Sequence, residues 1–215
     1  MRKWGFFSSS LADGFRGAVF SAAWIIAFVP LFASTTYAQT GARTLARSLD
    51  QLVDESEVIV RGYIASARIE PHPQLHNLMT VVVSMSVTDV YKGQPQKSLV
   101  FRQYIWNVDS KHGVPEYRKG RELILFLRPV SEYGLTSPPG LEQGRFEVIA
   151  RDKSGEKLAV NGRANLGLFD HIQEQARVRG MQLSRRSAVV VGQGKQGPVP
   201  VEVLEDVIRT FARAH

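Results

Sequence analysis

The chain has 215 residues, a net charge of +7 at neutral pH and no cysteine, which excludes disulfide bridges and thiolate metal sites. Its basic residues are scattered along the sequence and are not gathered into a stripe with interleaved aromatic side chains, so nucleic acid is not expected as a partner. A chain of this length and composition can bury a hydrophobic core large enough to fold without disulfide bridges or structural metal ions.

The first segment has the order of charged and apolar residues that is typical of a secretory signal peptide. Arg2, Lys3 and Arg16 supply a basic beginning, and an uncharged apolar run follows over residues 18–33. This run is shorter than the about 20 apolar residues that a membrane-spanning helix needs. The pattern therefore predicts a signal peptide over residues 1–38.

Small residues end this segment, and cleavage is expected near Ala38. We expect residues 39–215 to form a single exported domain in the periplasm or outside the cell, with no membrane span after signal removal. An uncleaved N-terminal anchor is the alternative.

Hydrophobic periodicity predicts a helix, then five or six strands, then a second helix. The first helix is expected over residues 44–55, where leucines recur at helical spacing. The second follows Pro200, because apolar residues from Leu204 to Phe211 share one stripe. The predicted strands cover residues 58–64, 81–87, 98–106, 121–127, 145–150 and 157–160.

The run over residues 121–127 is nearly continuous in apolar residues, which is typical of a central strand that is buried on both faces. The other strands follow one another through turns and loops, with no helix between most of them. These features favour a mainly β fold with flanking helices. We expect an OB-fold-like antiparallel Greek-key barrel of five to six strands with an N-terminal and a C-terminal helix.

Several stretches resemble the netrin-like module of the tissue inhibitors of metalloproteinases, a pattern also found in exported bacterial proteins of unknown function. They are S-E-V-I-V-R-G at 56–62, V-T-D-V-Y-K-G at 87–93, F-R-Q-Y-I at 101–105 and G-R-E-L-I-L-F-L at 120–127. The resemblance covers residues 54–160 and implies an OB-fold barrel, a shape that commonly serves binding. The inhibitors chelate zinc through an N-terminal Cys that this chain lacks, so no inhibitory residue is carried over.

Two apparent catalytic motifs lack the context that their chemistry needs. A G-x-G-x-x-G pattern at residues 192–197 follows an apolar run that could be a strand, but Pro198 interrupts the helix that a dinucleotide site requires. Ser154 and Lys157 match S-x-x-K, but they lie in a predicted hairpin turn. We predict no catalytic residue and no cofactor.

His72 and His76 are four residues apart, a spacing that places two metal ligands on one face of a helix. Pro71 and Pro73 argue against a helix there. No metal ligand is therefore assigned, although a metal held by the two histidines from a loop stays open.

Aromatic and polar residues beside the predicted loops form the candidate partner surface, which comprises Tyr104, Trp106, Asn107, Tyr117 and Tyr133. The alternative is that these rings cap the core. The expected function is a non-enzymatic binding module that recognises a protein or a cell-envelope component. A metal-dependent or other hydrolase built on the same barrel, and a structural subunit of an envelope assembly, are the alternatives.

Overall fold

The structure is a computed structural model that describes residues 45–105, 114–151, 155–194 and 196–213. These residues belong to one compact unit, Ala42–His215. The predicted signal peptide and its cleavage site lie outside the described residues. Within the described part of the chain, no helix has the length and apolar character needed to cross a membrane.

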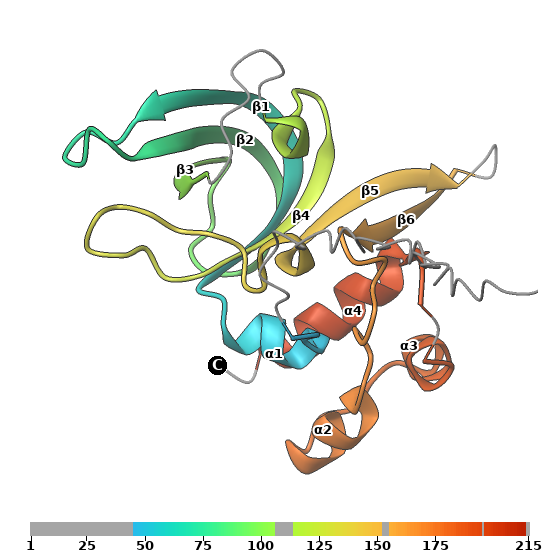
Figure 1. Cartoon of the computed structure of the whole chain (residues 1–215). Coiled ribbons are helices and arrows are strands. Elements are labelled where there is room, and N and C mark those ends of the chain that lie inside the picture. The colour runs from blue at the N-terminus through green and yellow to red at the C-terminus, as the bar shows by residue number, and fades with distance from the viewer. Residues whose placement is uncertain (1–44, 106–113, 152–154, 195, 214–215) are drawn as a thin grey trace, which may run out of the picture. The chain divides into compact units, whose positions relative to one another are not determined.

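The described chain is mainly β, with one antiparallel sheet and four α-helices (Figure 1). The helices are α1 (Leu49–Asp54), α2 (Ile172–Val178), α3 (Arg185–Gly192) and α4 (Val201–Ala212), with 3-10 turns η1 (Pro115–Tyr117) and η2 (Leu141–Gly144). The strands are β1 (Val58–Pro71), β2 (Met79–Lys92), β3 (Ser98–Tyr104), β4 (Glu122–Leu127), β5 (Arg145–Arg151), β6 (Glu156–Asn161) and β7 (Val199–Pro200).

The seven strands lie in the order β3-β2-β1-β4-β5-β6-β7. Within this order, β4, β1, β2 and β3 follow the Greek-key rule, in which a fourth strand returns to lie beside the first. The predicted antiparallel, mainly β character is therefore confirmed. The predicted barrel of five to six strands is not, because the sheet is open and has a seventh strand, β7, which pairs with β6 at Val199 and Pro200.

The first half of the sheet is strongly curved (Figure 1). The pairing of β1 with β2 shifts register at three places between Ile59 and Ser66, and such bulges bend a strand and increase its twist. Gly62 lies at one of these shifts. A Cβ atom there would lie 2.0 Å from the Ser86 carbonyl oxygen, so only glycine allows the two strands to approach at the bend.

Two hydrophobic cores lie on opposite faces of the sheet, and β4 contributes to both. Leu125 and the other odd-numbered residues of β4 face the inside of the curve, together with Val60, Val83 and Phe101. Ile124 and Phe126 face the other side, where they pack with residues of α1, α2 and α4. The four residues from Leu123 to Phe126 are at most 1 % exposed, and Val60 and Val83 are fully buried. The prediction of a central strand over residues 121–127 is confirmed.

The helices differ in how far they match their predictions. The C-terminal helix is confirmed as α4, whose predicted apolar stripe is fully buried. The N-terminal helix is shorter than predicted, because α1 begins only at Leu49. Residues before it are held in a non-helical path by Gln143, which accepts a hydrogen bond from Arg47 N and donates one to Leu45 O.

We predict that truncating either face of β4 destabilises the fold, because each face fills a different core. Leu125→Ala and Phe126→Ala should each lower the free energy of unfolding by about 2–5 kcal/mol in urea titrations. Val189→Ala on α3, where the side chain is 58 % exposed, is the control and should change it by less than about 0.5 kcal/mol. Destabilisation by only one of the two β4 variants would contradict a strand shared by two cores.

Candidate functional site

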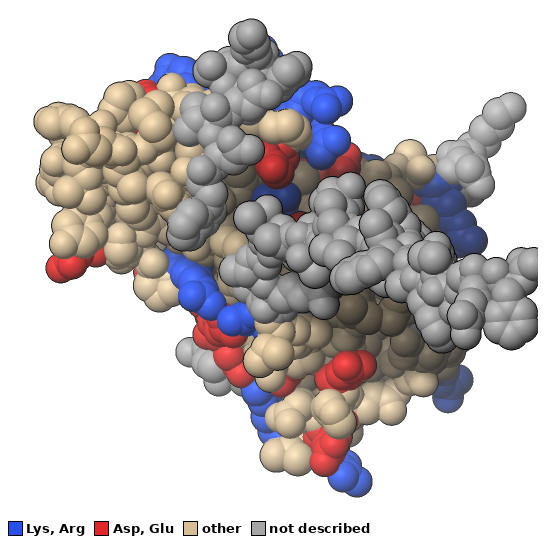
Figure 2. Space-filling model, in the orientation of Figure 1, with Lys and Arg blue, Asp and Glu red and all other residues tan. Residues whose placement is uncertain are grey.

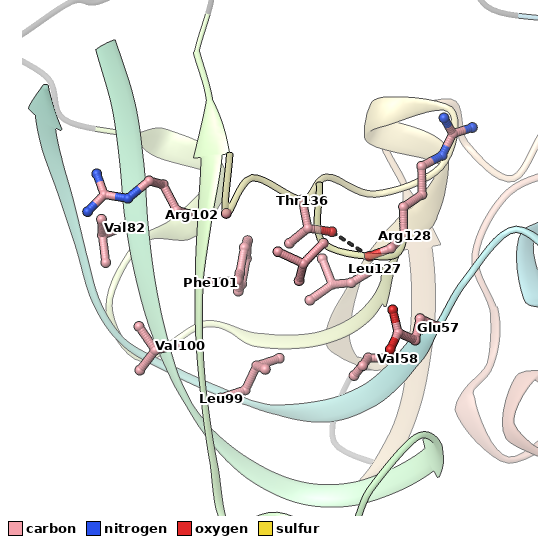
Figure 3. A pocket seen from close by; sticks show the side chains of 12 residues that line it. Glu57, Val58, Val82, Leu99, Val100, Phe101, Arg102, Leu127, Arg128 and Thr136 are labelled. Atoms are coloured by element: carbon pink, nitrogen blue, oxygen red, sulfur yellow. Dashed lines mark hydrogen bonds between the residues drawn. The ribbon is translucent and has the colours of Figure 1, made fainter. Parts of the chain in front are cut away.

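A hollow of about 340 Å³ lies on the open side of the curved sheet, between β3 and the loop of residues 128–137 (Figure 3). We call it the seam groove and define it by the residues that line it from β1 and the preceding Glu57, from β2, β3 and β4, and from this loop. Its lining is mainly apolar and includes Val58, Leu99, Phe101, Leu127, Val130 and Thr136.

Thr136 holds the loop against β3. Its backbone N–H donates to the carbonyl oxygen of Arg102 at 2.9 Å, and its hydroxyl donates to the carbonyl oxygen of Arg128 at 2.6 Å (Figure 3). Arg128 N also donates to Ser137 O at 3.2 Å, which brings the two ends of the loop together. The loop therefore forms one wall of the seam groove.

His72 supports the loop from the turn between β1 and β2. The ring is 1 % exposed, and Nε2 lies 2.7 Å from the carbonyl oxygen of Tyr133. Nδ1 accepts hydrogen bonds from the backbone N–H groups of Gln74 and Leu75 at 3.2 and 3.0 Å. Because Nδ1 is an acceptor, Nε2 carries the proton and donates to Tyr133.

Both ring nitrogens of His72 are thus engaged, so the ring is not available to a metal unless these bonds break. His76, its predicted partner in the open metal alternative, is exposed. Among the described residues, no group of three or more His, Cys, Asp or Glu side chains is arranged to hold a metal ion.

The outer edge of β3 carries backbone groups beside the groove that no described strand pairs. Val87 N donates to Lys97 O at 2.9 Å and Ile105 N to Met79 O at 3.4 Å, so odd-numbered residues of this stretch turn their backbone groups toward β2. Even-numbered residues turn their backbone N–H and C=O groups away from β2, as the hydrogen bond from Thr136 N to Arg102 O shows. No described residue bonds to the outward N–H and C=O groups of Val100.

The structure separates the residues of the predicted partner surface. Tyr133 lies on the groove loop and is 47 % exposed, and Tyr104 ends β3 and is half-buried. Tyr117 is 2 % exposed, donates its hydroxyl to Gln103 Oε1 at 2.7 Å and meets Phe101 edge-on. Its ring belongs to the core and not to an accessible surface. Trp106 and Asn107 lie outside the described residues.

Sequence reasoning missed Val100 and Val130, which are both 63 % exposed at the groove. Val130 follows a proline in a Pro/Gly-rich loop, and an apolar residue in such a loop is the only local signal. For Val100 the sequence carries no signal, because alternation does not show which strand lies at the edge of a sheet.

The G-x-G-x-x-G pattern does not form a phosphate-binding turn. The apolar run before it belongs to α3, which ends at Gly192, and is not a strand. A dinucleotide site needs a strand before the glycines and a helix after them, so the pattern lacks the first of these. Ser154, of the S-x-x-K pattern, lies outside the described residues.

A charged cluster lies where α4 meets the sheet, and we call it the Arg61 cluster. Arg61 binds Glu122 Oε1 at 2.5 Å and Glu205 Oε1 at 2.7 Å. Lys157 Nζ lies 2.8 Å from Glu122 Oε2, and the Tyr91 hydroxyl donates to Glu205 Oε1 at 2.6 Å. These contacts connect α4 to β1, β4 and β6. Because each carboxylate of the cluster is paired with a cation, neither is free to act as a catalytic acid or base.

The cluster also shifts the ionisation of its members. Burial alone would raise the pKa of Glu122, but hydrogen bonds from Lys157 and Arg61 outweigh burial and hold this pKa below its usual value. Burial and the hydrogen bond to Glu205 both raise the pKa of Tyr91. Tyr91 therefore stays a neutral donor at physiological pH.

We predict that Glu122 stabilises the fold above its unfolded pKa of about 4.3 and that this contribution is lost as the pH falls through the lower folded pKa. Glu122→Gln should lower the free energy of unfolding by about 1–3 kcal/mol at pH 7. Urea titrations from pH 7 to pH 3 should show this difference shrinking below about pH 4.3. A difference that stays constant over this range would contradict the role given to the ionised carboxylate.

Comparison with known proteins adds no identification, since no family model, no curated protein and no solved structure matches the chain.

Proposed function

We propose that the protein is a non-enzymatic binding module that recognises a protein or a cell-envelope component at the seam groove. The observation that carries this proposal is an apolar hollow beside an unpaired strand edge. Ligand sites are concave and mostly apolar, and a few polar groups fix the orientation of what they bind.

Exposed apolar side chains surround the groove and support this proposal. Val130 and Tyr133 lie on the loop that forms one wall, Val100 lies on β3 with its side chain on the outer face of the sheet, and Leu75 lies on the turn that His72 joins to that loop (Figure 3). The surface over the β1–β2 turn and the neighbouring loop carries few charged side chains (Figure 2). Contiguous exposed apolar surface marks places where partners bind.

We further propose that β1 to β5 are related to an OB-fold barrel, as the netrin-like resemblance implies. OB folds are five-stranded, partly open Greek-key barrels, and they bind ligands with their second and third strands and the loops after their first and fourth strands. The seam groove lies beside β3 and the loop that follows β4, and the turn after β1 supports it through His72. This agreement in position supports both the proposed fold relationship and the proposed site.

Export is part of the proposal and rests on the sequence of residues 1–38. An envelope or extracellular location would expose the groove to protein and envelope partners, and a fold without cysteine does not depend on the redox state of that compartment.

The test is the selection of ligands for the purified protein, after removal of the predicted signal peptide, from a displayed library of random dodecapeptides. We predict that Val130→Asp lowers the affinity of enriched peptides at least about tenfold, because it places a charge against the apolar lining. Val189→Asp on α3 is the matched control, since that valine is also exposed, and it should leave the affinity unchanged. Peptides that bind the wild type and Val130→Asp equally well would place binding elsewhere and contradict the proposal.

A further inference from the structure

The two edges of the sheet differ in how they are protected. The β7 edge consists of two residues, one of which is Pro200, and a short edge with proline is protected against further pairing. The β3 edge is seven residues long, and Ser98 to Phe101 include neither charge nor proline. The register of β3 with β2 contains no shift that would twist this edge away. Among the described residues, the edge beside the groove is thus open to pairing, whereas the other edge is not.

The outward backbone groups of β3 specify the shape of an occupant. Ser98 and Val100 present N–H and C=O groups to the open side, and Thr136 occupies the next such position at Arg102. An extended peptide supplies donors and acceptors at the spacing that a strand edge requires, and main-chain bonds of this kind give affinity in strand addition. Pairing is limited to the Ser98–Val100 part because the loop covers the rest.

The groove then receives the side chains of such a peptide. In an extended chain every second side chain turns to the same face, so alternate residues would enter the hollow beside Leu99, Leu127 and Val58. The lining is apolar at this point (Figure 3). Apolar residues at alternate positions therefore fit this groove.

Charge complementarity adds one further requirement. The two guanidinium groups at the groove already have anionic partners, since Arg102 pairs with Glu70 and Arg128 pairs with Glu55. Glu57 also lines the groove, and no described residue forms an ion pair with its exposed carboxylate. Glu55 also pairs with Arg47, so Glu57 is the lining carboxylate that no described residue pairs, and it offers a contact to one basic side chain.

We infer that the occupant of the seam groove is an extended segment of a partner protein that adds a strand to the outer edge of β3 through Ser98 and Val100, inserts alternate apolar side chains and places one basic side chain at Glu57. This inference rests on the proposed function and names the chemistry of its partner.

The experiment uses the peptides enriched by the displayed library and the same purified protein without its predicted signal peptide. Enriched peptides should have apolar residues at alternate positions and contain one Lys or Arg. Glu57→Gln should lower their affinity severalfold. N-methylation of alternate peptide amides in one register should lower the affinity at least about tenfold, and methylation in the other register should not, because only one set of amides faces β3.

A matched pair of protein variants tests the same contact from the other side. Val100→Pro removes an outward N–H without touching the bonds to β2, and should abolish binding, whereas Val100→Thr keeps the N–H and should retain it. The methylated peptides decide the question if Val100→Pro fails to fold.

Three results would overturn the inference. If Val130→Asp weakens the peptides but methylation of their amides in either register does not, the proposed function stands and the strand pairing is wrong. Enriched peptides that are acidic, or that bind Glu57→Gln as tightly as the wild type, would remove the basic contact. A dimer in sedimentation that Val100→Pro dissociates would assign the edge to a second copy of the chain.

Discussion

The structure depends on one strand that is buried on both faces. In β4, Leu123, Leu125 and Leu127 fill the inside of the curved sheet, while Ile124 and Phe126 pack against the helices. The strand therefore fixes the curved half of the sheet and the helical layer to each other through apolar contact, without disulfide bridges. The Arg61 cluster adds charged and hydrogen-bonded contacts between α4 and the same sheet.

This arrangement leaves one side of the curved sheet incomplete. No described strand pairs with the outer edge of β3, and a loop approaches this edge instead, held by Thr136 and by the buried His72 ring. The hollow that results has hydrogen-bonded walls on both sides, because one is a strand of the sheet and the other is a loop tied by Thr136 and His72. Binding sites supported in this way need little ordering when a partner arrives, which favours affinity.

The sequence predicted the features that depend on a long or strongly periodic pattern. The apolar run of β4 and the stripe of α4 belong to this kind, and both are confirmed. The two-residue strand β7 was missed because a dipeptide ending in proline carries no strand pattern. The apolar run before Gly192 could be a strand by its pattern but lies in α3, because so short a run has no decisive period. The site was harder to predict, since an open edge is a property of the whole sheet and appears in no local pattern around Val100.

The central claim is that partners bind along the outer edge of β3, and hydrogen exchange of the Val100 amide tests it most directly. This N–H has no partner among the described residues, so it should exchange fast in the free protein. When an enriched peptide is bound, the account predicts strong protection of Val100, with little change at amides of α2 and α3. Unchanged fast exchange at Val100 under saturating peptide, with protection on another face, would contradict it.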